Sequence, residues 1–111
     1  MNPSLEQPGD NFTVTIQVLD GSDRGRVFSR LSVPLTIGRQ ETNLVCLNDR
    51  RVSGCHAKVL LEGEDLVLTD MKSTNGTRVN GKFVQVLRLG FGDRIKVGKS
   101  VLLITFPATS M

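Results

Sequence analysis

The stretch Phe12-Thr13-Val14-Thr15-Ile16-Gln17-Val18 alternates apolar with polar residues, and Asp20-Gly21-Ser22-Asp23 follows shortly after it. Side chains of an extended chain point alternately to its two faces, so a period of two predicts a strand with one buried face. Asp, Gly and Ser favour turns. The segment from residue 12 to residue 23 therefore predicts a β-strand followed by a reversal of the chain.

The same pattern continues along the chain, as short apolar or alternating runs separated by Gly, Asn or Asp. No segment sustains a helical period, and Glu62–Asp65 and Val79–Lys82 have the composition of hairpin turns. We expect an all-β fold, a two-sheet β-sandwich of about ten or eleven mostly antiparallel strands, with a barrel as the alternative. The further runs are Arg26–Ser29, Leu35–Ile37, Leu44–Leu47, His56–Leu61, Leu66–Leu68, Phe83–Val86, Arg94–Val97 and Val101–Phe106.

The size and composition of the chain fit one globular domain. With 111 residues, 39% hydrophobic and 23% charged, the chain is long enough for one core and too short for two. Residues 1–11 carry Pro3, Pro8 and Gly9 without any periodicity and are predicted to be a flexible leader. The predicted sandwich domain spans residues 12–106, and residues 107–111 form a C-terminal tail.

The cysteines give no sign of a metal or cofactor site. Cys46 and Cys55 stand singly, with no CxxC or zinc-ligand spacing around them, so we expect neither a metal nor a cofactor. No apolar run approaches the roughly eighteen residues of a membrane span, and the N-terminus lacks the pattern of a signal peptide. The sequence therefore predicts a cytoplasmic protein with reduced thiols and no membrane partner.

The charge pattern gives only weak support for a nucleic-acid partner. The net charge is +3 and the pI is about 9.2, but the 14 basic residues are scattered along the chain. Aromatic residues make up 5% of the chain and are all Phe, which leaves little for base stacking. We expect no nucleic-acid partner. A basic β-barrel that binds nucleic acid nonspecifically remains an alternative, and it predicts binding that falls steeply with salt.

Three loops carry polar residues that a turn alone does not require. Together they offer a guanidinium, hydroxyls, a carboxamide and glycine-relaxed backbone amides, and a phosphate dianion is best bound by several such converging donors. The three loops contain, in order, Gly38-Arg39, then Ser53-x-x-His56, then Ser73-Thr74-Asn75-Gly76-Thr77 with Val79-Asn80-Gly81 behind it. In this order and spacing, these motifs resemble the forkhead-associated (FHA) domain family, over roughly Phe12 to Phe106.

The resemblance implies a β-sandwich that reads phosphothreonine in extended peptides with the loops at one end. Arg39 would be the charged clamp on the phosphate, and Ser53 and Thr74 would donate their hydroxyls. The backbone amide of Gly54 would complete the cradle. Many family members carry Arg or Asn at this place, so the chain lacks a side chain that could contact the peptide, and we expect a lower affinity.

The remaining residues of the motifs would bind the peptide or support the site. Asn75 would grip the peptide main chain just beyond the phosphothreonine. Arg51 corresponds to a position that in some relatives faces the third residue after the phosphothreonine, so we expect a preference for Asp or Glu there. Gly38, His56 and Gly76 would be structural, with His56 holding the Ser53 loop through hydrogen bonds.

The resemblance thus implies a phosphothreonine-dependent protein–protein interaction module of kinase signalling. The expected partner is a phosphothreonine-containing protein or peptide, such as a Ser/Thr kinase or its substrate, and the oligomeric state is open. The alternative within the family is an FHA scaffold that does not depend on phosphate. No enzymatic activity is expected, because Cys55 and His56 are neighbours in an extended chain and point to opposite faces.

Overall fold

Eleven strands and no helix occur in residues 12–107, the part of the chain that the computed structural model describes. The predicted leader, residues 1–11, lies outside this range, as does most of the predicted tail. None of the described residues belongs to a helix that could span a membrane. The strands are β1 (Thr13–Asp20), β2 (Val27–Ser32), β3 (Leu35–Gly38), β4 (Val45–Cys46), β5 (Ala57–Glu62), β6 (Asp65–Asp70), β7 (Thr77–Val79), β8 (Lys82–Val84), β9 (Val86–Arg88), β10 (Arg94–Val97) and β11 (Ser100–Thr105).

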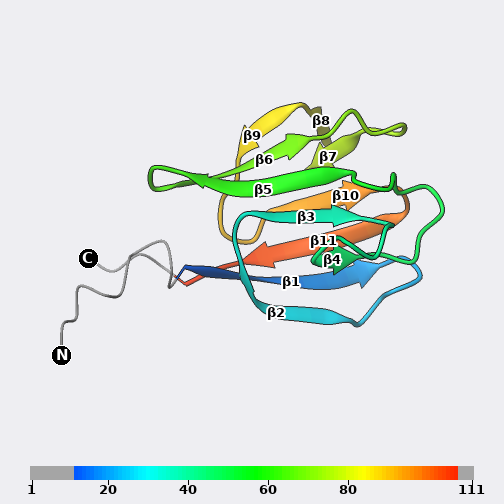
Figure 1. The fold of residues 1–111 in the computed structure, drawn as a ribbon, viewed down its shortest axis with the longest axis horizontal. Coiled ribbons are helices and arrows are strands. Elements are labelled where there is room, and N and C mark those ends of the chain that lie inside the picture. Colours follow the sequence, from blue (N-terminus) through cyan, green and yellow to red (C-terminus); the bar gives the residue numbers. More distant parts are fainter. Residues whose placement is uncertain (1–11, 108–111) are drawn as a thin grey trace.

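The strands form two sheets that face each other (Figure 1). One has six strands in the order β2-β1-β11-β10-β7-β8, and the other has five in the order β4-β3-β5-β6-β9. The β3–β4 pair is parallel, and every other pairing with an assigned register is antiparallel. The predicted two-sheet sandwich is confirmed, and the barrel alternative is wrong because the sheets do not close on each other.

The first strand has the buried face that its alternation predicts. Val14, Ile16 and Val18 are almost completely buried, whereas Gln17 between them is exposed. The inward faces of both sheets supply one continuous apolar core. Its fully buried large side chains include Ile16, Ile37, Leu47, Leu68, Ile95, Leu102 and Ile104.

Both predicted hairpin turns are present. Glu62 pairs with Asp65 and Val79 pairs with Lys82, so each turn has a loop of two residues. In the second turn the φ angles of Asn80 and Gly81 are 51° and 88°, which is the left-handed geometry that favours an Asn-Gly pair.

The region after the second hairpin differs from the prediction. Phe83–Val86 was expected to be one strand, but β8 ends at Val84 and pairs with β7, whereas β9 begins at Val86 and pairs with β6 in the other sheet. The chain changes sheets at Gln85, whose carbonyl accepts a hydrogen bond from Asp70 N–H at 2.8 Å. Strand β7 was not predicted, because three residues are too short to show a period.

One end of the sandwich carries the three loops that the sequence singled out. In Figure 1, strands β3, β6 and β10 all run toward the end opposite the two termini. The loops that follow β3, β4, β6 and β10 therefore gather at one end. The fold places the predicted polar residues on loops above a rigid core.

We expect Leu102→Ala to lower the free energy of unfolding by about 2 to 5 kcal/mol, because the variant leaves a cavity in the core. Leu102 is fully buried between cross-strand partners Val18 and Ile95. Urea denaturation measures the change. Leu44→Ala is the control, because Leu44 is 48% exposed, and the assignment of the core is wrong if both variants lose the same stability.

Candidate functional site

The three predicted loops are joined by hydrogen bonds from backbone N–H groups. Arg39 N–H donates to the carbonyl of Ser53 at 3.0 Å, and Gln40 N–H donates to the carbonyl of Gly54 at 3.2 Å. Thr74 N–H donates to Ser53 Oγ at 3.0 Å. The structure therefore brings Arg39, Ser53, Gly54 and Thr74 together, although 35 positions separate the first from the last.

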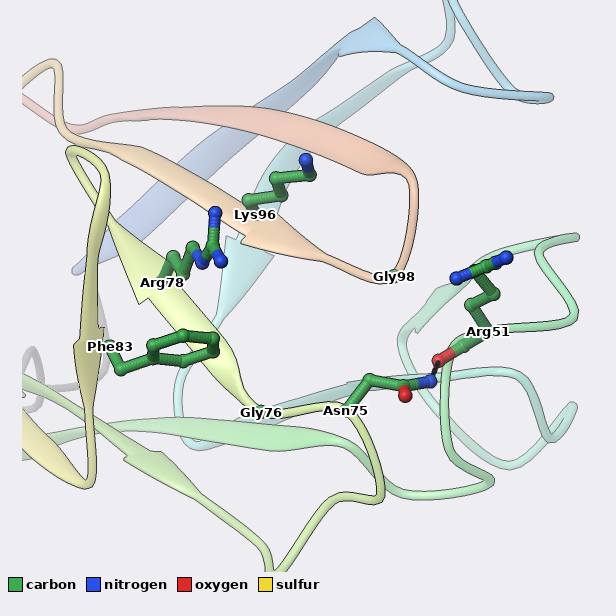
Figure 2. A pocket seen from close by; sticks show the side chains of 7 residues that line it. All are labelled: Arg51, Asn75, Gly76, Arg78, Phe83, Lys96 and Gly98. Carbon is green, nitrogen blue, oxygen red and sulfur yellow. Dashed lines mark hydrogen bonds between the residues drawn. The ribbon is translucent and has the colours of Figure 1, made fainter.

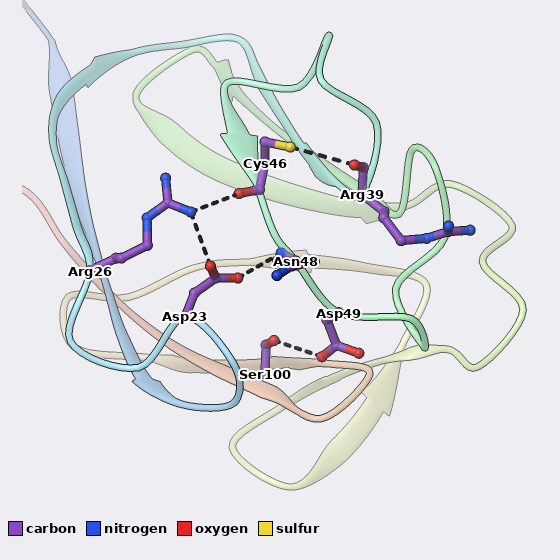
Figure 3. Close-up of polar contacts among 7 residues, drawn as sticks. All are labelled: Asp23, Arg26, Arg39, Cys46, Asn48, Asp49 and Ser100. Atoms are coloured by element: carbon purple, nitrogen blue, oxygen red, sulfur yellow. Dashed lines mark hydrogen bonds and ion pairs between the residues drawn. The ribbon is translucent and has the colours of Figure 1, made fainter.

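The Arg39 side chain is held at its base and exposed at its end. Nε donates to the carbonyl of Val52 at 3.0 Å, and neither of the two ion pairs within residues 12–107 involves this guanidinium. Behind it, Cys46 Sγ–H donates to the Arg39 carbonyl at 3.4 Å (Figure 3). The terminal nitrogens of Arg39 are therefore oriented and free to bind an anion through two N–H groups at once.

His56 connects the second loop to the third from a fully buried position. Its Nδ1 lies 3.0 Å from the N–H of Ser53, and its Nε2 lies 2.8 Å from the carbonyl oxygen of Gly76. An amide N–H can only donate and a carbonyl can only accept, so the ring is neutral with its hydrogen on Nε2. His56 thus fixes both loops with one planar ring.

The backbone at Gly54 presents N–H groups outward. The carbonyls of Ser53 and Gly54 both accept hydrogen bonds from the Arg39-Gln40 segment. In a trans peptide the N–H points opposite to the C=O, so the N–H groups of Gly54 and Cys55 point away from that segment. Neither takes part in a hydrogen bond within the described part of the chain. Two adjacent free amides therefore lie beside Ser53.

Asn43 was missed by the sequence analysis and supports this geometry. It is buried, and its Nδ2 donates to the carbonyls of Gln40 at 2.7 Å and Gly54 at 2.6 Å. Gly38 lies so close to this contact that a Cβ there would collide with the Gly54 carbonyl oxygen. Asn43 stands in an ordinary polar stretch, so no local pattern marks it.

Gln40 was also missed, and it lies over Gly54. A Cβ added to Gly54 would be 2.9 Å from Gln40 Cδ, so the Gln40 carboxamide occupies the space into which a side chain at position 54 would project. The backbone at Gly54 does not have the positive φ that only glycine adopts readily. The absence of a side chain at this place therefore leaves room that the exposed Gln40 fills.

Asp70 shapes the third loop. Its Oδ1 accepts hydrogen bonds from the hydroxyls of Ser73 and Thr77, both at 2.6 Å, and its Oδ2 accepts one from Ser73 N–H at 3.1 Å. Ser73 Oγ in turn accepts from Gly76 N–H at 2.9 Å, where the φ of Gly76 is 84°. The loop that carries Thr74 and Asn75 is thus organised from within.

Asp49 performs the same task for the second loop. Figure 3 shows its carboxylate beside Ser100, whose hydroxyl donates to Oδ2 at 2.7 Å. Lys99 N–H donates to Oδ2 and Arg51 N–H donates to Oδ1, each at 2.9 Å. These bonds tie the segment before Ser53 to the turn between β10 and β11.

Burial raises the pKa of both carboxyl groups, but hydrogen bonds outweigh it. The Ser100 hydroxyl and two backbone amides stabilise ionised Asp49, with a smaller contribution from the charge of Lys99. The Ser73 and Thr77 hydroxyls and the Ser73 amide do the same for Asp70. The pKa of each group therefore lies below its ordinary value.

Asn75 and Arg51 border a hollow of about 220 Å³ beside the three loops (Figure 2). Asn75 Nδ2 donates to the backbone carbonyl of Arg51 at 2.9 Å, which leaves Oδ1 exposed and joins the second loop to the third once more. The hollow continues past Gly76 along strands β7 and β10. Within residues 12–107, no His, Cys, Asp and Glu side chains group together as metal ligands.

A two-sheet sandwich with these interlocked loops at one end has the architecture of an FHA domain. A sequence model of the FHA domain matches residues 35–98, which include every predicted site residue. The chain belongs to the FHA domain family.

Relatives in mycobacteria support this assignment. FhaA of Mycobacterium tuberculosis is 37% identical over 92 residues, which cover 83% of this chain and 17% of that protein. Glycogen accumulation regulator GarA of Mycolicibacterium smegmatis is 34% identical over 79 residues, which cover 71% of this chain and 50% of GarA. The chain therefore matches only about half, or much less, of the length of these curated relatives.

Solved FHA domains have the same fold. One, from a study of phosphothreonine-dependent FHA domain interactions, superposes with a TM-score of 0.77 at 35% identity, covering 87% of this chain and 99% of that one. The FHA domain of FhaA, solved in complex with the intracellular domain of Rv3910, has a TM-score of 0.73 at 37% identity, covering 83% of this chain and 99% of that one.

We expect the protein to lose stability as the pH falls below about 4. Asp49 and Asp70 have lower pKa values in the folded protein than the ordinary 3.8, so their contribution is complete above that value. It is lost as the pH falls through 3.8 toward the lower folded pKa values. Urea denaturation between pH 7 and pH 2.5 measures this.

Asp70→Asn tests the cause. The variant should be less stable than wild type at pH 7 by about 1 to 3 kcal/mol, and its stability should depend less on acid because the titrating group is gone. Asp65→Asn is the surface control. If Asp70→Asn has the same pH dependence as wild type, the carboxylate of Asp70 does not stabilise the loop as we describe.

Proposed function

We propose that this chain is a non-catalytic module that binds a phosphothreonine-containing segment of a partner protein. One observation carries the proposal: a charged guanidinium, two hydroxyls and two free backbone amides converge at one end of the sandwich, and the described ion pairs neutralise none of them. Converging donors of this kind suit a phosphate dianion.

The hydrogen bonds suggest how the cradle works. The terminal nitrogens of Arg39 would bind two phosphate oxygens together. Ser53 Oγ accepts from Thr74 N–H, so its own hydrogen is available to donate to a third oxygen. The exposed hydroxyl of Thr74 and the N–H of Gly54 complete the set. The N–H of Cys55 is a further donor that the sequence analysis missed.

Asn75 would hold the peptide main chain. Its exposed Oδ1 can accept a peptide N–H, while the bond from Nδ2 to the Arg51 carbonyl fixes the plane of the carboxamide. An extended peptide offers such groups along its whole length, so this contact would position the residue after the phosphothreonine without selecting a side chain. Selection would then depend on the neighbouring hollow.

Similarity to known FHA domains supports the choice of phosphothreonine. The structures at 35% and 37% identity come from work on phosphothreonine-dependent interactions and on a complex of FhaA with the intracellular domain of Rv3910. By analogy, the partner would be a phosphorylated signalling protein, such as a Ser/Thr kinase or its substrate. The free thiols of Cys46 and Cys55 fit the predicted cytoplasmic location.

Arg39→Ala should weaken binding of a phosphothreonine peptide by about 2 to 5 kcal/mol, which is at least about thirty-fold in Kd, because the phosphate loses its bidentate partner. Calorimetry with the best peptide of an oriented phosphothreonine library measures this. Arg39→Lys should retain part of the affinity, since it keeps the charge without the planar fork.

Phosphoserine and unphosphorylated versions of the same peptide, and the variant Arg88→Ala on β9, are the controls. Equal binding of all three peptides, or wild-type affinity of Arg39→Ala, rejects the proposed site. If the partner still binds after phosphatase treatment and binding falls steeply with salt, nonspecific electrostatic binding of the kind expected for nucleic acid is favoured instead.

We also expect a preference for Asp or Glu at the third residue after the phosphothreonine, because Arg51 borders the hollow next to Asn75. A peptide array in which only that position varies measures it. Arg51→Gln should abolish the acidic preference, and its persistence in this variant would assign the preference to another residue.

A further inference from the structure

The hollow beside Asn75 carries more positive charge than one acidic side chain requires. Three of its lining residues are cations, Arg51, Arg78 and Lys96, and none is acidic. Figure 2 shows Arg51 on one side of the hollow and the side chains of Arg78 and Lys96 on the other. The two groups of charge are therefore separate features of the same hollow.

Arg78 and Lys96 form a like-charge pair that costs stability. They lie directly opposite each other where β7 pairs with β10, and both are exposed. Like charges at opposite positions of adjacent strands destabilise a sheet. Neither residue belongs to an ion pair in the part of the chain that the structure describes. An anion bound between them would remove this repulsion.

The guanidinium of Arg78 is held in place by Phe83. Arg78 Cζ lies 4.3 Å from the centre of the ring, within the range of a cation–π contact. The ring also packs against Gly76, where a Cβ would be only 2.8 Å from Phe83 Cε1. Phe83 is nevertheless 65% exposed, so this large apolar side chain is held at the surface beside the cation. The stack orients the guanidinium before any ligand arrives.

The position of this pair relates it to the proposed phosphothreonine site. Asn75 and Gly76 belong both to the third loop and to the wall of the hollow. Arg78 follows them along β7, and an extended peptide advances by roughly 3.3 Å per residue in the same way as a strand. A peptide that crosses the hollow from Asn75 would have Arg51 on one side and would reach Arg78 and Lys96 on the other a few residues later.

We propose that Arg78 and Lys96, supported by Phe83, form a second phosphate site for another phosphorylated residue of the same peptide, roughly four to six positions after the phosphothreonine. The proposal rests on the proposed function, because the phosphothreonine anchors the peptide. A phosphate dianion matches this pair better than a carboxylate does, since it offers oxygens to both cations at once and carries nearly twice the charge.

The test compares synthetic peptides that differ at one residue. Each carries the phosphothreonine, a constant third residue after it, and phosphoserine, glutamate or serine at position four, five or six. Fluorescence anisotropy gives each Kd. For at least one position, the second phosphate should tighten binding by five-fold or more relative to serine, and glutamate should give a smaller gain. No gain at any position overturns the proposal.

The double variant Arg78→Gln/Lys96→Gln assigns the gain to these residues. In this variant the Kd values of the doubly and singly phosphorylated peptides should become equal. Arg94→Gln, on the same strand as Lys96 but outside the hollow, should keep the wild-type ratio. A ratio that survives the double variant, or that Arg94→Gln abolishes equally, shows general charge attraction and overturns the proposal. If the singly phosphorylated peptide does not bind wild type at all, the proposed function itself fails.

Discussion

The arrangement of the site depends on the buried ring of His56. The Ser53 loop and the third loop approach closely above the core, and the backbone groups buried between them need hydrogen-bond partners. The His56 ring fills the space between the loops and supplies these partners, since Nδ1 accepts from Ser53 N–H and Nε2 donates to the Gly76 carbonyl. Its own backbone N–H and C=O pair with Ile37 and Met71, so the ring is positioned by the sheet itself. The position of the ring in turn fixes the hydroxyl of Ser53 and the turn at Gly76.

A second constraint is the close contact between the first two loops. Gly38 allows it because no Cβ intervenes, and Asn43 secures it by donating to the Gly54 carbonyl. Because the carbonyls of Ser53 and Gly54 point inward to this contact, the N–H groups of the residues that follow them point outward, toward the proposed position of a bound anion. The capacity to bind an anion therefore arises from how the backbone satisfies its own hydrogen bonds, and no side chain at position 54 is needed for it. The space that its absence leaves is filled by Gln40, whose carboxamide lies at the edge of the cradle.

The sequence predicted those parts of the structure that have a local signature. Alternation identified β1, and Asn80-Gly81 identified a hairpin whose left-handed φ angles are present. Alternation could not show that Phe83–Val86 is divided between two sheets, because a strand that changes partner keeps its period. Asn43 and Asp49 were missed for a related reason. Ser100, which donates a hydrogen bond to Asp49, lies 51 positions away in the sequence. Contacts between residues so far apart produce no local sequence pattern from which they could be predicted.

The basic residues around the site differ in whether they have ion-pair partners. Arg26 is paired with Asp23 behind the loops (Figure 3). Arg39, Arg78 and Lys96 are not paired within the described chain, and two of them repel each other across adjacent strands. Such repulsion lowers the stability of the sheet, and the fold does not require it. It is tolerated where the loss of stability is small or where a bound anion compensates for it. The contact with Phe83 favours the second explanation, because it holds the Arg78 guanidinium at the edge of the hollow, where an anion can reach both Arg78 and Lys96.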